Sequence, residues 1–334
     1  MHSTVRLAFP KMVAIAQILG ALCTALLTQS VVASEAYPTR PVRMIVPYPP
    51  GGGLDLPGRV VGQKFAEQTG QQLVLDNRGG AGGLIAGEIV ARATPDGYTL
   101  LLASNGQISI APFLYNKMPY DPLVDLVPVT HFIDTPMALF AATSFPAQSV
   151  KDVIALAKAK PGTIGVALSG VGGLSHLNME LFRQRAGISL LGVPYRGAGA
   201  AMGDIAAGTV PLIFSTIAGA KPLVDSGRLR PLAIGARNRA ASLSNTPTFE
   251  ELGFSGMDAP LWIGIMAPKG TPAAILAKLN AEFSKALALP DVKERLAAQG
   301  ADVVAGGPRE FAQTIKRDTA IWRDVVKTAN IKLE

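Results

Sequence analysis

The chain has 334 residues, of which 49% are hydrophobic, and a formal net charge of +7. Its 31 basic residues are scattered without a Lys/Arg cluster, which argues against a nucleic-acid-binding surface and indicates only a mild attraction for anionic ligands. A single cysteine excludes a disulfide framework, so a chain of this length depends on its hydrophobic core, which is large enough for two domains.

The N-terminal segment has the layout of a secretory signal peptide. Basic Arg6 and Lys11 precede an apolar run over residues 12–27, and small residues suited to cleavage follow. The alternative, a permanent membrane anchor, needs about 20 apolar residues, more than this run supplies. Cys23 lies inside the run, so the mature chain contains no cysteine. We predict a cleaved signal peptide over 1–36, export to a periplasm and a soluble mature protein.

Short apolar runs alternate with amphipathic stretches along the rest of the chain. This alternation predicts strands buried between helices, an α/β architecture. Ser149-x-x-Asp152 and Thr248-x-x-Glu251 read as capping boxes at helix starts, and Thr271-Pro272 reads as a cap before a proline. A further helix is expected from Pro308. The predicted strands cover residues 42–46, 73–75, 99–103, 138–142, 164–167, 191–193, 212–214, 232–234 and 262–266.

No internal repeat or Pro/Ser-rich linker divides the chain. If two domains are present, the chain therefore crosses between them through ordered segments. The apolar runs over residues 128–142 and 258–267 are the candidates for these crossings.

The segment from Val46 to Asp55 is the most informative part of the sequence. It reads as a buried strand that enters a turn with three consecutive glycines before a helix begins. Without Cβ atoms, and beside the unsatisfied N–H groups of a helix N-terminus, such a turn can hold a carboxylate or phosphate without Lys or Arg. The structural alternative is a tight connection without a ligand. In either case Asp55 suits the N-cap of the following helix.

Four further segments share this glycine-rich character, and several of them follow apolar runs. In open α/β sheets, ligands bind beyond the carboxyl ends of strands, where such loops meet helix N-termini. No segment matches G-x-G-x-x-G or G-x-x-x-x-G-K-[ST], so a nucleotide site is not expected. The pattern favours a carboxylate. The four segments cover residues 77–83, 104–106, 169–176 and 194–199.

Candidate catalytic residues are few. After signal cleavage only His131 and His176 remain, and the sequence contains no G-x-S-x-G elbow and no H-E-x-x-H helix. We interpret both histidines as structural and predict no catalytic residue, no metal site and no cofactor. Tyr48 and Tyr195 lie in loops, where each ring either lines a pocket or packs on the surface. Arg196 either forms a salt bridge with an anionic ligand or is simply exposed to solvent.

Short motifs follow one another in a fixed order along essentially the whole mature chain. They are Tyr37-Pro38-x-Arg40-Pro41, Val46-Pro47-Tyr48-Pro49-Pro50-Gly51-Gly52 with Asp55, Asn77-Arg78 with Gly80-Ala81-Gly82-Gly83, Pro95-Asp96-Gly97-Tyr98-Thr99-Leu100-Leu101, Tyr120-Asp121-Pro122, His176-Leu177, Val193-Pro194-Tyr195-Arg196-Gly197, Pro247-Thr248-x-Glu250-Glu251 and Ala267-Pro268-x-Gly270-Thr271-Pro272. In this order they resemble the Bug (TctC-like) family, the periplasmic solute-binding proteins of tripartite tricarboxylate transporters.

The resemblance implies a type II periplasmic-binding-protein fold, a Venus flytrap of two α/β domains around a cleft. Residues 37–139 plus 260–334 would form the first domain and residues 140–259 the second. The implied function is the capture of a small carboxylate-bearing organic acid by domain closure, by a monomer that delivers the acid to membrane permease subunits. Two alternatives remain open: a sensor that presents its closed form to a sensor kinase, and a secreted α/β hydrolase with a nucleophile and a base in the cleft.

The resemblance also implies which residues face the ligand. Leu54 and Gly173 stand where the family usually has a hydroxyl-bearing residue, and Gly79 stands where it usually has proline. These departures favour a less polar or larger carboxylate than a tricarboxylate. The expected ligand-binding residues are Tyr48, Pro50, Gly51, Gly52, Gly53, Asp55, Ser104, Asn105, Ser169, Gly172, Gly173, Tyr195, Arg196 and Gly197.

Overall fold

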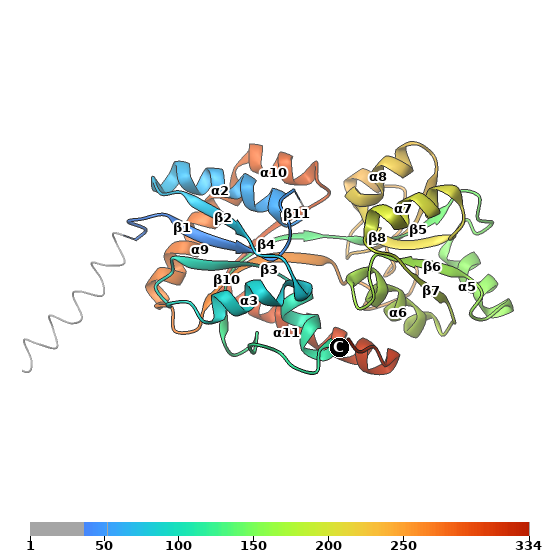
Figure 1. The fold of residues 1–334 in the computed structure, drawn as a ribbon. Coiled ribbons are helices and arrows are strands. Elements are labelled where there is room, and N and C mark those ends of the chain that lie inside the picture. The colour runs from blue at the N-terminus through green and yellow to red at the C-terminus, as the bar shows by residue number, and fades with distance from the viewer. Residues whose placement is uncertain (1–36, 52, 334) are drawn as a thin grey trace, which may run out of the picture.

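The computed structural model describes residues 37–51 and 53–333 (Figure 1). The predicted signal peptide and Gly52 lie outside these residues. The described chain forms two separate mixed sheets, each with helices on both faces, which confirms the predicted α/β class. We call each sheet with its helices a lobe. Among the described residues, no helix combines the length and the apolar character needed to cross a membrane.

The first lobe is built on a six-stranded sheet with the order β11-β4-β10-β3-β1-β2. β1 pairs in parallel with β2 and β3, whereas β10 runs antiparallel to both β3 and β4. Because β1 and β3 are parallel neighbours, the loops that follow them meet at one edge of the sheet. The strands are β1 (Val42–Val46), β2 (Leu73–Asn77), β3 (Thr99–Ser104), β4 (Leu126–Thr135), β10 (Leu261–Pro268) and β11 (Asp302–Gly306).

Helices bury apolar side chains against both faces of this sheet. Figure 1 shows α2 and α10 above the sheet and α3 and α11 below it. Phe65 of α2 stacks on Phe283 of α9 in the upper layer. The upper layer contains α2 (Asp55–Thr69), α9 (Ala273–Ala288) and α10 (Pro290–Ala297); the lower layer contains η1 (Ala81–Gly83), α3 (Leu84–Ala91), the π-helical turn η2 (Gly106–Ile110), α4 (Ala111–Leu114) and α11 (Pro308–Ala329).

The second lobe is built on a five-stranded sheet with the order β7-β6-β8-β5-β9. β6 is parallel to β7 and β8, and β5 is antiparallel to β8 and β9. α5 and α6 cover one face and α7 and α8 the other. The elements are β5 (Met137–Ala142), α5 (Val150–Ala159), β6 (Gly165–Leu168), α6 (Leu174–Ala186), β7 (Leu191–Pro194), α7 (Ala198–Ala207), β8 (Leu212–Thr216), α8 (Ile217–Asp225), β9 (Leu229–Gly235) and η3 (Ala241–Leu243).

The chain changes sheet at two ordered points. β4 of the first sheet ends at Thr135 and β5 of the second begins at Met137, so the first change falls at Pro136. The chain returns where β10 begins at Leu261. Both apolar runs expected to cross lie at these points. The chain changes sheet at Pro136, three residues before residue 139, where the predicted first domain ends. The division into two domains stays a prediction.

The C-terminal helix α11 contacts both lobes. Phe311 and Ile315 in its first half pack under the first sheet. Trp322 and Val325 in its second half join the buried cluster of the second lobe, where Gln184 of α6 donates to the Val325 carbonyl at 3.4 Å. α11 therefore packs against both lobes, the first with its N-terminal half and the second with its C-terminal half.

Two predicted helix starts are wrong in detail. The reciprocal contacts of a capping box form between Thr248 and Glu251, with N–H donors at 2.7 and 3.1 Å, but only a turn follows. This turn ends at Gly253, whose φ of +86° breaks any helical continuation. Pro272, rather than Thr271, is the N-cap of α9, which begins at Ala273. The Thr271 hydroxyl donates to the Pro268 carbonyl at 2.8 Å instead of capping the helix.

Candidate ligand-binding site

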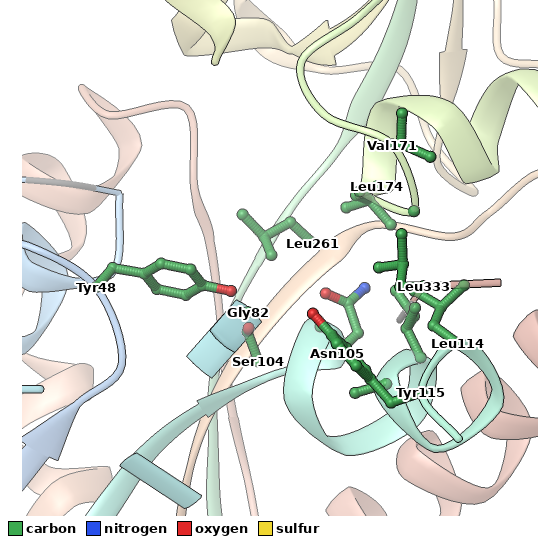
Figure 2. A pocket seen from close by; sticks show the side chains of 15 residues that line it. Tyr48, Gly82, Ser104, Asn105, Leu114, Tyr115, Val171, Leu174, Leu261 and Leu333 are labelled. Atoms are coloured by element: carbon green, nitrogen blue, oxygen red, sulfur yellow. The ribbon is translucent and has the colours of Figure 1, made fainter. Parts of the chain in front are cut away.

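A cavity of about 210 Å³ lies between the two lobes (Figure 2). Its walls combine loops that follow strands β1, β3 and β6 with the start of β10 and the C-terminal segment. Both lobes therefore contact anything held there. The lining residues are Tyr48, Gly82, Ser104, Asn105, Gly106, Ile110, Ala111, Leu114, Tyr115, Val171, Gly172, Gly173, Leu174, Leu261 and Leu333.

Hydroxyl groups of the first lobe face the cavity. Tyr48 follows β1 and Ser104 ends β3, two parallel neighbours whose carboxyl ends meet. A Cβ on Gly106 would lie 3.2 Å from the Tyr48 hydroxyl and 3.7 Å from the Ser104 hydroxyl, so this glycine admits both groups. Burial raises the pKa of the Tyr48 phenol, which therefore stays protonated and can donate a hydrogen bond at neutral pH.

Asn105 connects the end of β3 to the returning chain. Its side chain is buried, and its Nδ2 donates to the Pro260 carbonyl at 2.9 Å. Pro260 directly precedes Leu261, the first residue of β10 and a wall of the cavity. Asn105 therefore fixes the position of the strand that re-enters the first lobe.

The second lobe presents the N-terminus of α6. Gly173 is the N-cap, and the first N–H groups of this helix have no acceptor within it and carry partial positive charge. Gly172 has a φ of +75°, and a Cβ there would lie 2.9 Å from Leu114 and 3.0 Å from Leu333. The lobes therefore approach so closely at Gly172 that a side chain has no room.

Apart from Tyr48, the described residues of the loop between β1 and α2 lie beside this cavity rather than in its wall. Asp55 is the first residue of α2, one position after the N-cap Leu54, so its predicted N-cap position is wrong by one residue. Its carboxylate is buried and accepts hydrogen bonds from Gly51 N at 2.8 Å, Asn77 Nδ2 at 3.0 Å and Arg59 Nε at 2.7 Å. Burial alone would raise the pKa of Asp55, but these donors hold it below its ordinary value.

These contacts give Asp55 a structural role in shaping the loop. Pro50, Gly51 and Gly53 are not among the lining residues. The Gly51 N–H is also used inside the loop by Asp55 rather than left for a ligand. Whether this loop reaches a bound ligand stays a prediction.

Replacing Asp55 with asparagine is expected to lower the free energy of unfolding by about 1.5 kcal/mol, because a buried, charge-assisted acceptor is lost. Urea unfolding at pH 7 measures the effect. Arg59→Gln is the control, since the Arg59 side chain is 53% exposed and its removal is expected to cost less than about 1 kcal/mol. Equal losses in the two variants would contradict the role of Asp55 in holding the loop.

The remaining predicted residues form a neighbouring loop pair in the second lobe. Tyr195 N donates to the Leu168 carbonyl at 2.9 Å and Gly197 N to the Ser169 carbonyl at 3.1 Å, so the loops after β6 and β7 lie side by side. The Tyr195 hydroxyl donates to Asp204 at 2.7 Å. Arg196 is exposed. None of these residues is among those that line the cavity, and their contact with a ligand stays a prediction.

Sequence reasoning missed most of the apolar wall. Gly82 and Gly106 lay within glycine segments that it singled out, and Val171 and Leu174 lay within another. Tyr115, Leu261 and Leu333 carried no signal, because only the folded chain brings them together.

The histidines have structural partners. His176 Nδ1 accepts from Gly172 N at 3.1 Å, and burial lowers the pKa of its ring. His131 Nε2 lies 2.8 Å from Asp134 Oδ1, away from the cavity wall. Among the described residues, no group of three or more His, Cys, Asp or Glu side chains is arranged to hold a metal ion.

Comparison with known proteins gives consistent matches. A family model described as "Tripartite tricarboxylate transporter family receptor" (TctC) matches residues 58–331. Protein BugT of Bordetella pertussis is 37% identical over 304 residues, covering 91% of this chain and 93% of BugT.

Solved structures of related proteins are similar to this chain over most of its length. The structure of a periplasmic transporter is 38% identical with a TM-score of 0.77, covering 89% of this chain and all of that one. Rpa4515 of R. palustris, solved with adipate, is 35% identical with a TM-score of 0.77 and the same coverage. MatC of Rhodopseudomonas palustris, solved with bound malate, is 33% identical with a TM-score of 0.74, covering 87% of this chain and all of MatC.

Proposed function

The chain belongs to the tripartite tricarboxylate transporter receptor (TctC) family, and on that premise we propose that it binds a small carboxylate-bearing organic acid between its lobes and delivers it to a membrane transporter. Members of this family are solute-binding receptors rather than enzymes, as the resemblance to Bug proteins predicted. The two mixed α/β lobes have the type II periplasmic-binding-protein fold, which confirms the predicted fold class.

One observation carries the proposed ligand class. The cavity between the lobes is lined by hydroxyl groups and an amide from the first lobe and by a helix N-terminus from the second. None of the described lining residues carries a charge, so an acid would be held by neutral donors, as the glycine loops led us to expect. The adipate and malate in the two Rhodopseudomonas structures are small carboxylates and support this class.

The geometry supports a mechanism of closure. A ligand shifts the balance between open and closed lobes only by its difference in affinity for the two states. A molecule in this cavity contacts Tyr48 and Ser104 from one lobe and Gly172 to Leu174 from the other, so it stabilises the closed state. The closed form would then be recognised by membrane subunits of the transporter.

The proposed location is the periplasm. Relatives with solved structures are described as periplasmic proteins, and the predicted signal peptide would export this chain. The signal segment lies outside the described residues and stays a prediction.

The ligand class is tested by calorimetry on residues 37–334 with a panel of organic acids that includes adipate and malate. A ligand present at 100 times its dissociation constant stabilises the protein by about 2.7 kcal/mol, so the melting temperature should rise as well. A panel in which a sugar or a metal ion binds and no acid does would refute the proposal.

Tyr48→Phe is expected to weaken binding of the best acid about tenfold, because one hydroxyl donor to the anion, worth about 1.4 kcal/mol, is removed. The matched control is Tyr98→Phe, because Tyr98 bonds to Thr39 on a part of the first lobe away from the lining residues. Unchanged affinity in the Tyr48 variant would place the acid elsewhere.

A further inference from the structure

We propose that His176 is a positioning residue for ligand binding. Its neutral ring holds the second-lobe wall of the cavity in place, and its protonated ring cannot, so acid pH weakens the binding of the ligand. This inference rests on the proposed function and deepens it. It follows from the contact between His176 and Gly172, from the place of Gly172 where the lobes meet, and from a comparison with Asp55 in the first lobe.

The loop before α6 is held by side chains from the first turn of that helix. Gly172 N donates to His176 Nδ1 at 3.1 Å, and Ser169 N donates to Ser175 Oγ at 2.8 Å. Gly172 and Gly173 line the cavity, whereas His176 is not among the lining residues. His176 therefore acts on a ligand through the loop and not by direct contact.

The contact with Gly172 determines the protonation of the ring. A backbone N–H can only donate, so His176 Nδ1 is the acceptor and the ring proton is on Nε2. Nε2 faces Glu180 Oε1 at 3.8 Å. Protonation would add a hydrogen to Nδ1, and two donors would then face each other. Only the neutral ring can therefore hold Gly172.

The loop has little freedom to rearrange when this contact is lost. A Cβ on Gly172 would lie 2.9 Å from Leu114 Cδ1 and 3.0 Å from Leu333 Cδ1, so the loop is already packed closely against the first lobe. The movement left to it is away from that lobe. Such a movement lowers the affinity for a ligand that contacts both walls of the cavity.

The surroundings of the ring favour its neutral form. Burial lowers the pKa of His176, and Arg183 acts in the same direction, while Glu180 acts in the opposite direction. Arg183 also donates to Glu180 at 2.6 Å. The loop over residues 169–173 and the strands β6 and β8, which pack against α6, contain no charged residue. On α11, which also packs against α6, Asp318 is held by Trp262. The other charged side chains on this side are exposed, namely Arg323, Asp324, Lys327 and Lys332.

The first lobe uses the same arrangement with an acceptor that does not titrate in this range. Gly51 N donates at 2.8 Å to Asp55, which follows it by four residues, as His176 follows Gly172. The pKa of Asp55 is held below its ordinary value, so its carboxylate stays charged at pH 4.5 and above. Acidification therefore releases the loop of the second lobe and leaves the loop of the first lobe held. The affinity is complete above the ordinary histidine pKa of about 6.5 and falls as the pH drops through the pKa of the ring.

Calorimetry on residues 37–334 at pH 7.5 and pH 4.5 tests this inference with adipate, malate and the tightest acid of the panel. The matched variant is His176→Asn, whose amide oxygen replaces Nδ1 as acceptor and does not titrate. The acids themselves titrate in this range, so the ratio of the wild-type affinity to the variant affinity is compared. The two proteins are expected to bind within about threefold of each other at pH 7.5, and the wild type about fivefold more weakly than the variant at pH 4.5.

Two further variants separate the acceptor from the fold. His176→Leu removes the acceptor and is expected to weaken binding about tenfold at pH 7.5, a loss that His176→Asn does not show. His131→Asn is the control, because His131 is the only other histidine of residues 37–334 and lies away from the cavity wall. It is expected to keep the pH dependence of the wild type.

Three outcomes would overturn the inference and leave the proposed function intact. They are a ratio of affinities that does not change with pH, wild-type binding that strengthens relative to His176→Asn on acidification, and a nitrogen NMR spectrum at pH 7.5 with the ring proton of His176 on Nδ1. The NMR measurement needs no ligand. Failure of every acid to bind at both pH values would overturn the proposed function and this inference together.

Discussion

Replacing Gly264 with alanine is expected to lower the free energy of unfolding by about 3 kcal/mol, because the site has no room for a methyl group. Gly264 lies in β10, in the middle of the first sheet. A Cβ there would lie 2.3 Å from Phe311 Cζ and 2.9 Å from the Thr130 carbonyl oxygen. Phe311 is fully buried and packs edge-on against Trp262, so its ring cannot move aside without opening the core.

Gly203→Ala is the matched control for this substitution. Gly203 lies inside α7, and a Cβ there would meet no atom within 4 Å outside its chain neighbours and the backbone of its own helix. Alanine is expected to stabilise this helix by about 1 kcal/mol, since glycine is the poorer helix former. Urea unfolding of both variants measures the two changes in the free energy of unfolding, which are expected to have opposite signs. Unfolding of the Gly264 variant at the wild-type urea concentration would show that α11 does not press on β10 as described.

The strands of the two sheets were largely predictable because most of them are buried on both faces. The apolar runs gave nine strands, and each is present with its ends shifted by a few residues at most. β4 was missed as a strand because Pro128, His131 and Asp134 interrupt its apolar run, although His131 and Asp134 satisfy each other in the fold. β11 was missed because it is a short edge strand whose residues remain partly exposed.

The candidate site was predictable where backbone chemistry marks it. Tyr48, Ser104, Asn105 and the glycines before α6 lie at or just after strand ends, and the topology of an α/β sheet brings such positions together. Leu333 was beyond prediction, because its place in the wall depends on how α11 ends against α4, far away in sequence. A chemical motif marks the polar end of the cavity, whereas the apolar end depends on tertiary packing alone.

Replacing Asp318 with asparagine is expected to make the protein more stable at pH 7.5 and to weaken the dependence of stability on pH. Asp318 lies on α11, is 4% exposed and accepts a hydrogen bond from Trp262 Nε1 at 2.8 Å. Burial raises the pKa of this carboxyl from 3.8 to about 6, although the Trp262 donor and the charge of Arg317 act in the opposite direction. The folded protein therefore favours the neutral acid.

The direction in which stability changes with pH follows from proton binding by Asp318. Between pH 4 and pH 6 the folded state holds a proton on Asp318 that the unfolded state has lost, so this stabilisation is complete below about pH 4 and is lost as the pH rises through 6. A shift of about two pKa units corresponds to about 3 kcal/mol. Asparagine stays neutral and keeps an acceptor for Trp262, so Asp318→Asn should gain about 2 kcal/mol at pH 7.5 and little at pH 4.5.

Urea unfolding at the two pH values measures this difference. Asp324→Asn on the same helix is the control, because Asp324 is exposed and its replacement is expected to change stability by less than about 0.5 kcal/mol. Trp262, the partner of Asp318, adjoins Leu261 of the cavity wall. Ligand binding by the Asp318 variant is therefore measured as well. A variant that is more stable and still binds acid normally would show that the charged carboxylate is needed neither for folding at neutral pH nor for ligand binding. A loss of stability at pH 7.5 would instead show that the charged carboxylate is the form that the folded protein prefers.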